Sequence, residues 1–285
     1  MSTHSNAKSV VITGASTGIG RACALYLDQH GLRVFAGVRK QADADDLRQA
    51  ASEHLTPVFI NVTDTATIAT AAEQVRVALQ GSGLAGLINN AGVAFGGPLE
   101  FLPIEKLKTQ LEINVIGQVA VTQAFLPLLR PAQGRIINMS SISGRLAMPF
   151  LGPYAASKFA LEALTDSLRL ELKPWGIEVV SIEPGAIKTP IWDKSVAEAH
   201  SMVEELPPQA KTLYGPVMER LVKTITRTGE AGIPAEAVAK VVAEALLTPQ
   251  PKTRYLVGRN AKFGALLARF LPDRLRDKIV LKRRG

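Results

Sequence analysis

Tyr154 and Lys158 lie four residues apart in the stretch GPYAASK, with only small residues between them. On a helix, residues at positions i and i+4 share a face, so we expect the phenol and the ammonium to be neighbours. A free phenol has a pKa of about 10, and a nearby ammonium lowers that pKa because it stabilises the phenolate. A phenol that can both give and take a proton is suited to interconverting an alcohol and a carbonyl compound.

A glycine-rich turn, TGASTGIG, follows the short apolar run at 8–13. Glycines let a backbone approach a ligand closely, and a helix that begins here offers free amides and a positive dipole end to a pyrophosphate. The spacing differs from the common GxGxxG, so a plain tight turn is the alternative to dinucleotide binding. The residues that we expect to touch a dinucleotide are Gly14, Ser16, Thr17, Gly18, Ile19 and Gly20.

The end of the second predicted strand, 33–38, indicates which dinucleotide binds. Val38 stands where an acidic residue often binds the adenosine ribose, and Arg39 and Lys40 follow it. A missing carboxylate with adjacent cations favours a 2′-phosphate, hence NADP(H), while NAD(H) stays open. The alternative is two solvated cations at the start of a helix.

Strands and helices are predicted to alternate along the chain. The strands are expected at 8–13, 33–38, 57–62, 84–89, 134–140, 177–183 and 254–257, and the helices at 19–30, 65–79, 103–129, 153–173 and 236–247. Several of these strands are apolar on both faces, which is typical of a parallel sheet covered by helices on both sides. We therefore expect an α/β fold, a doubly wound Rossmann-type sheet in a single domain spanning 1–285.

The segment 190–232 interrupts this alternation. A connection of that length is usually a lid, a binding element or a disordered segment. Tyr214, Met218, Leu221 and Ile225 recur at helical spacing, so part of the segment is predicted to be an amphipathic helix. We expect it to cover a substrate.

Composition and charge narrow the class of protein. The apolar content of 47% and charged content of 20% are ordinary for a soluble globular chain. A single cysteine fits a reducing compartment, and a polar N-terminus with no apolar run approaching a membrane span points to the cytoplasm. The four histidines show no ligand spacing, so no metal is expected.

The net charge of +8 resides in the tail, because 252–285 holds 11 Lys and Arg against 2 Asp and Glu. A neutral body argues against a nucleic-acid partner. In the predicted tail, 259–285, one apolar helical stripe is flanked by basic residues; it consists of Phe263, Leu266, Leu267, Phe270 and Leu271. Such a helix can lie on an anionic membrane, or it can dock on another subunit or on its own body. We expect docking, since a stripe of this width is ordinary for a core-facing helix.

Five motifs together resemble the short-chain dehydrogenase/reductase family, from about residue 8 to residue 189. In chain order they are TGASTGIG for the family's TGxxxGxG, Asn89-Asn90-Ala91-Gly92 for NNAG, Asn114 in EINVIG, Ser141 thirteen residues before Tyr154, and PGAIKT at 184–189 for PGxIxT. One departure follows the third predicted strand, where Asn61-Val62 replaces the family's Asp-Val.

The resemblance implies definite roles. Tyr154 would pass the proton, Ser141 would hydrogen-bond the substrate oxygen, and Lys158 would bind the nicotinamide ribose. Asn114 would complete a proton relay through a water held by a distorted helix. Further contacts to the cofactor are implied for Asn61, Val62, Asn90, Ala91, Gly92, Pro184, Gly185, Ile187 and Thr189. Family members commonly form dimers or tetramers through the helices that carry Asn114 and Tyr154.

The predicted substrate contacts are apolar. Met148 and Phe150 lie between Ser141 and Tyr154, and Trp192 lies in the segment 190–232. Such walls favour an extended hydrophobic alcohol or ketone, unless these residues only pack that segment onto the sheet. The C-terminal part resembles the retinol and 17β-hydroxysteroid dehydrogenase branch, which implies a retinoid, a steroid or a similar lipid-like compound. The alternatives are a 3-oxoacyl thioester reductase and a non-catalytic NADP(H)-sensing protein.

Overall fold

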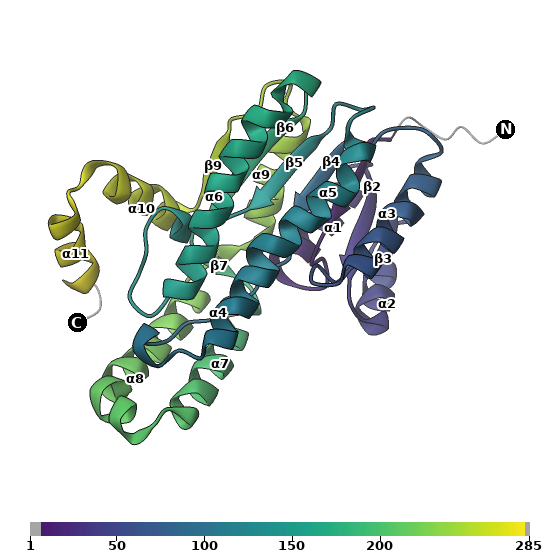
Figure 1. Cartoon of the computed structure of the whole chain (residues 1–285). Coiled ribbons are helices and arrows are strands. Elements are labelled where there is room, and N and C mark those ends of the chain that lie inside the picture. The colour runs from purple at the N-terminus through teal and green to yellow at the C-terminus, as the bar shows by residue number, and fades with distance from the viewer. Residues whose placement is uncertain (1–6, 283–285) are drawn as a thin grey trace.

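The computed structural model describes residues 7–282, in which strands and helices alternate (Figure 1). The strands are β1 (Ser9–Ile12), β2 (Arg33–Val38), β3 (Leu55–Phe59), β4 (Gly86–Asn89), β5 (Arg135–Met139), β6 (Glu178–Pro184), β7 (Ile187–Lys188), β8 (Ile233–Pro234) and β9 (Arg254–Val257). The α-helices are α1 (Gly18–Gln29), α2 (Gln41–Ala50), α3 (Thr65–Leu79), α4 (Ile104–Leu111), α5 (Gly117–Leu129), α6 (Gly152–Leu172), α7 (Ile191–Glu205), α8 (Pro208–Glu230), α9 (Ala235–Leu247), α10 (Arg259–Phe270) and α11 (Asp273–Lys282). Shorter turns are η1 (Leu99–Phe101), η2 (Glu112–Ile116), η3 (Ile142–Gly144) and η4 (Lys173–Trp175).

The main sheet is parallel, with the strand order β3-β2-β1-β4-β5-β6-β9. Successive strand residues point to opposite faces. Val10 and Ile12 accordingly join the core that packs against α1, α2 and α9, whereas Val11 joins the core that packs against α3, α5 and α6. Helices therefore cover both faces, which confirms the predicted doubly wound fold.

The order of the strands locates a crevice. From β1 the chain continues to β2 and β3 on one side, and then returns to β4 on the other side. Open α/β sheets bind ligands beyond the carboxyl ends of the strands at such a switch point. The glycine turn after β1 and the loops after β4 and β5 all leave the sheet at this edge.

Most predicted boundaries are close to the observed ones, and the third strand differs most. It was expected at 57–62, but β3 begins at Leu55, which pairs with Val34 of β2. Pro57 lies inside the strand rather than at its start. Because β3 is an edge strand, the missing amide of Pro57 can face away from β2.

The segment 190–232 is helical rather than disordered. It consists of α7 and α8, and it is entered and left through the short parallel pair β7 and β8. Met218, Leu221 and Ile225 of α8 are buried against partly buried apolar residues that include Phe150 and Trp192. The amphipathic helix predicted here is confirmed, and in Figure 1 the pair projects beyond the end of the sheet.

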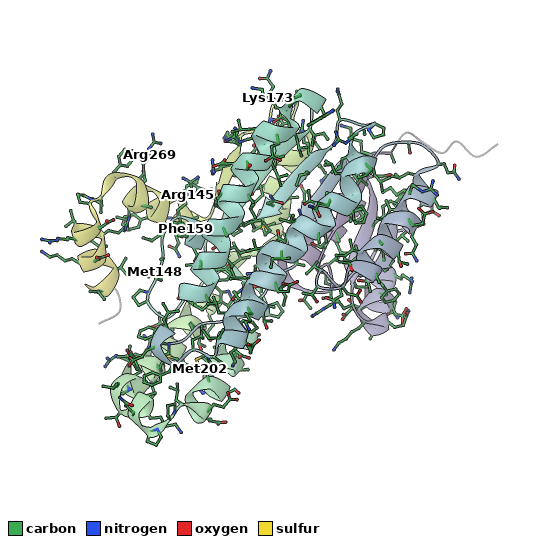
Figure 2. All side chains as sticks on the ribbon, viewed as in Figure 1. Arg145, Met148, Phe159, Lys173, Met202 and Arg269 are labelled. Carbon is green, nitrogen blue, oxygen red and sulfur yellow. The ribbon has the colours of Figure 1, made fainter. Side chains whose placement is uncertain are left out.

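The C-terminal helix α10 docks on the body, but not by the predicted stripe. Its buried residues are Ala261, Gly264, Ala265 and Leu267. Phe263, Leu266 and Phe270 are 41%, 56% and 66% exposed. Small residues permit a close approach, because a Cβ on Gly264 would lie 2.8 Å from Cγ1 of Ile142. On the body, the stripe therefore packs only through Leu267 and partly through Leu271, so docking of the whole stripe on the body is wrong, while docking on another subunit stays a prediction. Figure 2 shows Arg269 on this projecting helix.

One expectation about membranes also needs correction. The continuous helical run Ile104–Leu129, which joins α4, η2 and α5, is long enough to cross a membrane, and it contains an 18-residue window with a mean hydropathy of 1.3. The sequence therefore does contain an apolar run of that length. In the fold, Val121, Phe125 and Leu129 of this run are fully buried against the sheet. A core helix of this kind passes the same compositional test.

Candidate active site

Tyr154 and Lys158 lie on one face of α6, as predicted. The helix begins at Gly152 and has Pro153 in its first turn, a position that tolerates proline because that amide has no helical partner. Lys158 Nζ is 5.7 Å from the centroid of the Tyr154 ring. The Lys158 side chain is buried, and its ammonium donates a hydrogen bond of 2.8 Å to the carbonyl of Met139. The end of β5 thus holds the lysine beside the phenol.

Burial and local contacts shift the pKa values of both groups. Burial lowers the pKa of Lys158 to about 8, and the carboxylate of Glu162 opposes that effect. Burial raises the pKa of Tyr154, and a hydrogen bond with the Ser141 hydroxyl opposes the rise. Lowering of the phenol pKa by Lys158 was expected, whereas in this structure the net shift is upward and the opposing contact is Ser141. Tyr154 is therefore protonated at neutral pH.

Ser141 follows β5 and caps the short turn η3. Its Oγ accepts a hydrogen bond of 3.1 Å from the amide of Ser143, which fixes the side chain at the edge of the crevice. Because Ser141 also hydrogen-bonds Tyr154, the structure brings together the two hydroxyls that the sequence separates by thirteen residues.

Asn114 lies in a π-helical turn, η2, between α4 and α5. π-turns inside α-helices occur frequently at functional sites. Its buried side chain donates to the carbonyl of Val93 at 2.9 Å and to Ser157 Oγ at 3.1 Å, and it accepts from the amide of Val93 at 2.9 Å. The helix distortion implied by the family resemblance is present, and it places Asn114 against the residue preceding Lys158.

The glycine turn and the NNAG segment are joined by hydrogen bonds. Asn90 Nδ2 donates to the carbonyls of Thr13 and Gly14 at 3.0 and 3.1 Å. Thr13 Oγ1 accepts from the amides of Asn90 and Ala91, both at 3.0 Å. Gly14 has φ of +66°, in the left-handed region that favours glycine. The backbone is thus held in a tight, preformed cradle.

The start of α1 fits a pyrophosphate. Its N-cap, Thr17, makes no capping hydrogen bond within the residues that the structure describes, whereas Asp64 caps α3 by accepting from the amides of Ala66 and Thr67. The first amides of a helix otherwise need a partner, and they favour an anion. Ser16 is partly exposed beside them, while Ile19 packs against the core. The turn therefore offers backbone donors and little side-chain obstruction.

Arg39 and Lys40 lie exposed at the end of β2. Neither makes an ion pair or side-chain hydrogen bond to any part of 7–282. Val38, where an acid would bind a ribose, is buried. Two unpaired cations at this edge suit a 2′-phosphate.

The Asn61-Val62 pair contributes less side-chain surface than expected. Asn61 Oδ1 accepts hydrogen bonds from the amide and the hydroxyl of Thr63, at 3.3 and 3.0 Å. The side chain of Val62 belongs to the core. Contact between Val62 and a cofactor would therefore involve the backbone.

The PGAIKT segment reaches the glycine turn through Thr189. A Cβ on Gly18 would lie 3.3 Å from Cβ of Thr189, so the two motifs face each other closely. Ile187 is buried. Gly185 packs against Ala261 of α10, because a Cβ on Gly185 would lie 3.0 Å from the amide nitrogen of Ala261. Pro184 ends β6. Ile187 and Gly185 thus present backbone, not side chain, to the crevice.

The predicted substrate residues separate into two groups. Phe150 has φ of +64°, and its ring lies 6.2 Å from that of Tyr214 in an edge contact. Trp192 packs in the same cluster, and its indole nitrogen donates to the carbonyl of Ile187 at 2.6 Å. Met148 is partly exposed in the loop before α6 (Figure 2). Trp192 therefore also anchors α7, as the packing alternative expected.

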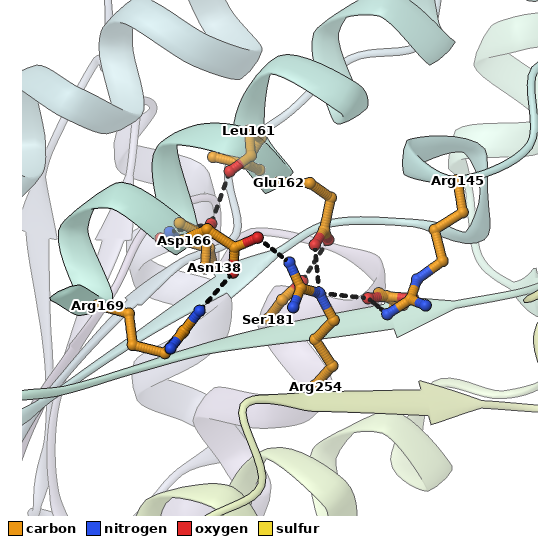
Figure 3. Close-up of polar contacts among 10 residues, drawn as sticks. Asn138, Arg145, Leu161, Glu162, Asp166, Arg169, Ser181 and Arg254 are labelled. Carbon is orange, nitrogen blue, oxygen red and sulfur yellow. Dashed lines mark hydrogen bonds and ion pairs between the residues drawn. The ribbon is translucent and has the colours of Figure 1, made fainter. Parts of the chain in front are cut away.

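Sequence reasoning missed a partly buried cluster of charges behind Lys158, of which Glu162 and Glu183 are the buried members. Its members are Arg145, Glu162, Asp166, Glu183 and Arg254 (Figure 3). The one available signal was the spacing of Glu162, four residues after Lys158 on the same helix. Among the described residues, no group of three or more His, Cys, Asp or Glu could hold a metal ion.

The fold and this site define an α/β dehydrogenase, and comparisons with known proteins agree. The short chain dehydrogenase family model matches residues 8–200. The NADPH-dependent 3-dehydrocapnine reductase of Ornithobacterium rhinotracheale is 39% identical over 95% of each chain. The 17-beta-hydroxysteroid dehydrogenase type 6 of Bos taurus is 37% identical over 98% of this chain and 89% of that protein. Retinol dehydrogenase 5 of Homo sapiens is 38% identical over 95% and 87%.

Solved structures give the same result. A short-chain dehydrogenase from Streptomyces avermitilis superposes with a TM-score of 0.77 at 27% identity, covering 98% of this chain and 97% of that one. A short chain dehydrogenase from Burkholderia cenocepacia J2315, in complex with NADP, has a TM-score of 0.72 at 27% identity, covering 96% and 97%. The chain belongs to the short-chain dehydrogenase family. Within it, the chain falls in the branch of retinol and 17β-hydroxysteroid dehydrogenases, and it is an oxidoreductase that acts on alcohol or carbonyl groups.

Proposed function

We propose that the protein is an NADP(H)-dependent oxidoreductase that interconverts a hydrophobic alcohol and its ketone or aldehyde. The observation that carries the proposal is the placement of Tyr154 beside the buried Lys158 on α6, with Ser141 at the end of β5, at the switch point of the sheet. Arg39 and Lys40 support the choice of cofactor. The choice of NADP(H) is also supported by two similar proteins. The Ornithobacterium relative is named as NADPH-dependent, and the Burkholderia cenocepacia structure is a complex with NADP. A Burkholderia phymatum neighbour is a complex with NAD, so NAD(H) stays the alternative cofactor.

The residues divide the work of binding the cofactor. The glycine turn and the start of α1 bind the pyrophosphate, Arg39 and Lys40 bind the 2′-phosphate, and Lys158 binds the nicotinamide ribose. Further backbone contacts come from the segments after β3, β4 and β6. When bound, the nicotinamide supplies or accepts the hydride.

The proton is handled by Tyr154. Because its pKa is raised, the phenol is protonated at neutral pH and can donate to a carbonyl oxygen as that oxygen gains charge. Ser141 holds the same oxygen by a hydrogen bond. In the reverse direction the phenolate takes the proton of the alcohol, and Lys158 stabilises that phenolate. Asn114, through its distorted helix, connects Lys158 to solvent.

The substrate is proposed to be lipid-like, of the steroid, retinoid or a similar class. Phe150 and Met148 supply apolar surface between Ser141 and Tyr154, and Trp192 lies beside Phe150. The segment 190–232 acts as the lid. Its contacts to the body support that role: Lys106 pairs with Glu198 of α7, and the Tyr214 hydroxyl donates to Glu100 at 2.8 Å.

The tail is proposed to touch anionic membrane surfaces. α10 leaves Phe263, Leu266 and Phe270 exposed, and Lys262 and Arg269 flank them. Apolar side chains beside cations bind anionic lipid headgroups and the acyl chains beneath them. Replacing these three apolar residues by serine should abolish flotation with anionic liposomes, whereas a Val77→Ser and Leu170→Ser double variant should float like the parent protein. Equal flotation of both variants would exclude this contact.

The oligomeric state is proposed to be a homodimer or homotetramer built on the helices that carry Asn114 and Tyr154. Ile116 and Phe159 are exposed apolar residues on these helices. Such surface is available for burial against a second copy. A single monomer mass in light scattering would contradict this proposal.

A substrate screen tests the central proposal. Consumption of NADPH, followed by absorbance, should occur with one or more steroid, retinoid or lipid-like carbonyl compounds. Acyl thioesters and simple ketones serve as the comparison classes. Turnover confined to acyl thioesters would favour the 3-oxoacyl reductase alternative. Cofactor binding without turnover of any compound would favour the non-catalytic sensing protein, although Tyr154 and Lys158 are both present.

A further inference from the structure

The charged cluster behind Lys158 is assembled from α6, from strands β6 and β9, and from the loop after η3 (Figure 3). Arg254 of β9 lies at its centre. Its Nε donates to Glu162 of α6 at 2.9 Å and lies 3.4 Å from Glu183 of β6. Its Nη2 donates to Asp166, one turn beyond Glu162, at 2.5 Å. One guanidinium therefore serves three carboxylates.

A second guanidinium completes the cluster. Arg145, in the loop after η3, donates to Glu183 from Nη2 at 2.7 Å and pairs with it through Nε at 2.5 Å. Glu183 is 0% exposed, and burial raises its pKa while Arg145 lowers it. Buried carboxylates are costly unless they are paired and hydrogen-bonded. The cluster therefore needs both arginines.

Glu162 is the member that faces the catalytic lysine. It lies four residues after Lys158, on the same face of α6. Its Oε1 accepts a hydrogen bond of 2.5 Å from Ser181 Oγ, and its Oε2 accepts from Arg254. With both oxygens bound, the carboxylate is fixed in place one helical turn from a buried ammonium.

We propose that Glu162, fixed by Ser181 and Arg254, is a positioning residue that keeps Lys158 charged at neutral pH. Lys158 is 4% exposed, and within residues 7–282 the hydrogen-bond acceptor of its ammonium is the neutral carbonyl of Met139. A carboxylate one turn away supplies the negative charge that this acceptor lacks. The role assigned to Lys158 in catalysis rests on the proposed function, whereas its charge state does not.

Other charges around Lys158 bear on its titration. On α6 these are Tyr154, Glu162 and Asp166; from β6, Glu183; from β9, Arg254; and from the loop after η3, Arg145. Facing it from η2 is Asn114, which carries no charge. The cluster sets the two guanidiniums of Arg254 and Arg145 against the three carboxyl groups of Glu162, Asp166 and Glu183. Of these three, Glu162 lies nearest to Lys158 along α6.

The charge of Lys158 can be followed directly in the full-length protein. Lysine labelled with ¹³C at Cε reports its titration by NMR, and Lys158→Arg assigns the resonance. The midpoint is expected near pH 8 in the parent protein. Glu162→Gln should lower it by about one pH unit, as loss of one nearby opposite charge does. Glu162→Asp, which keeps the charge, should restore most of that change.

Asp166→Asn is the matched control, because it removes another carboxylate bound to Arg254 one turn farther from Lys158. It should leave the midpoint unchanged. An unchanged midpoint in Glu162→Gln, or an equal change in Asp166→Asn, would overturn the proposal. If Glu162→Gln does not fold, Ser181→Ala keeps the charge but frees one carboxylate oxygen. It should lower the midpoint in the same direction, and no change there would overturn the proposal as well.

This titration is independent of turnover. If the Lys158 midpoint is the same in Glu162→Gln and in the parent protein, and the parent protein reduces a carbonyl compound, the role of Glu162 is refuted and the proposed function is not. If Glu162→Gln lowers the Lys158 midpoint as expected but the parent protein reduces no carbonyl compound, the proposed function is refuted and the role of Glu162 is not. In an active protein, Glu162→Gln should also move the acidic limb of alcohol oxidation to higher pH, since a neutral lysine no longer stabilises the phenolate.

Discussion

Lys158 and Tyr154 occupy consecutive turns of α6, with the ammonium nitrogen 5.7 Å from the centroid of the phenol ring. The lysine is held from behind by the carbonyl of Met139, and the phenol hydroxyl is engaged by Ser141. In this arrangement the serine acts on the proton of the phenol, and the lysine supplies charge beside the ring. The two supports lie close together in the chain, since Met139 ends β5 and Ser141 follows it two residues later.

Replacing Tyr154 by phenylalanine removes the group that passes the proton. General acid–base catalysis by one side chain contributes about 10² to 10⁴-fold, so turnover should fall by that factor. NADPH binding, measured by fluorescence titration, should change little because the ring remains. Tyr26→Phe is the control, since Tyr26 lies on α1 and stacks on His30. Full turnover in Tyr154→Phe would refute the assigned role.

Replacing Arg39 by alanine tests the choice of cofactor. A lost charge-assisted hydrogen bond costs on the order of 1.5–3 kcal/mol, which weakens NADPH binding about ten- to hundredfold. NADH lacks the 2′-phosphate, so its dissociation constant should stay nearly the same. Arg48→Ala is the control, because Arg48 is already paired with Asp45. Equal weakening of both cofactors would contradict the 2′-phosphate role of Arg39.

The architecture and the central pair could be predicted because both depend on short-range patterns. Strands such as β2, apolar on both faces, indicate a buried parallel sheet, and the i, i+4 spacing of Tyr154 and Lys158 indicates a shared helix face. The glycine turn was predictable for the same reason. In each case the information lies within one or two elements.

The charged cluster could not be predicted, because its partners are distant in sequence. Glu162 and Arg254 are 92 residues apart, and the pairing of β6 with β9 brings them together. The face by which α10 docks was missed for a related reason. Hydrophobicity favoured the stripe that includes Phe263, whereas the close approach to Ile142 selected the small residue Gly264.

Gly20 tests the tight packing of the glycine turn. A Cβ there would lie 2.2 Å from the carbonyl oxygen of Gly14 and 2.4 Å from Asn90 Nδ2. Gly20→Ala should therefore displace the turn, destabilise the protein by about 1–3 kcal/mol and weaken NADPH binding. Gly215→Ala is the matched control, because its Cβ would meet nothing within 4 Å in the middle of α8. It should raise stability by up to about 1 kcal/mol in denaturant titrations.

The buried Lys158 predicts a pH-dependent stability. Burial lowers its pKa from 10.5 to about 8, so between these values the unfolded chain holds a proton that the folded chain has released. The free energy of unfolding should therefore rise with pH in that window. Below about pH 8 the buried charge costs the fold about 3 kcal/mol, at 1.36 kcal/mol per pH unit.

Lys158→Met isolates this effect, because every other titrating group is common to both proteins. The variant should be inactive, yet more stable than the parent protein at pH 7, and its advantage should shrink as the pH approaches 10. Denaturant unfolding at pH 7, 8, 9 and 10 measures the difference. A constant difference across this range would show that Lys158 does not lose its proton there, and that the charge is better stabilised than the burial of its side chain implies.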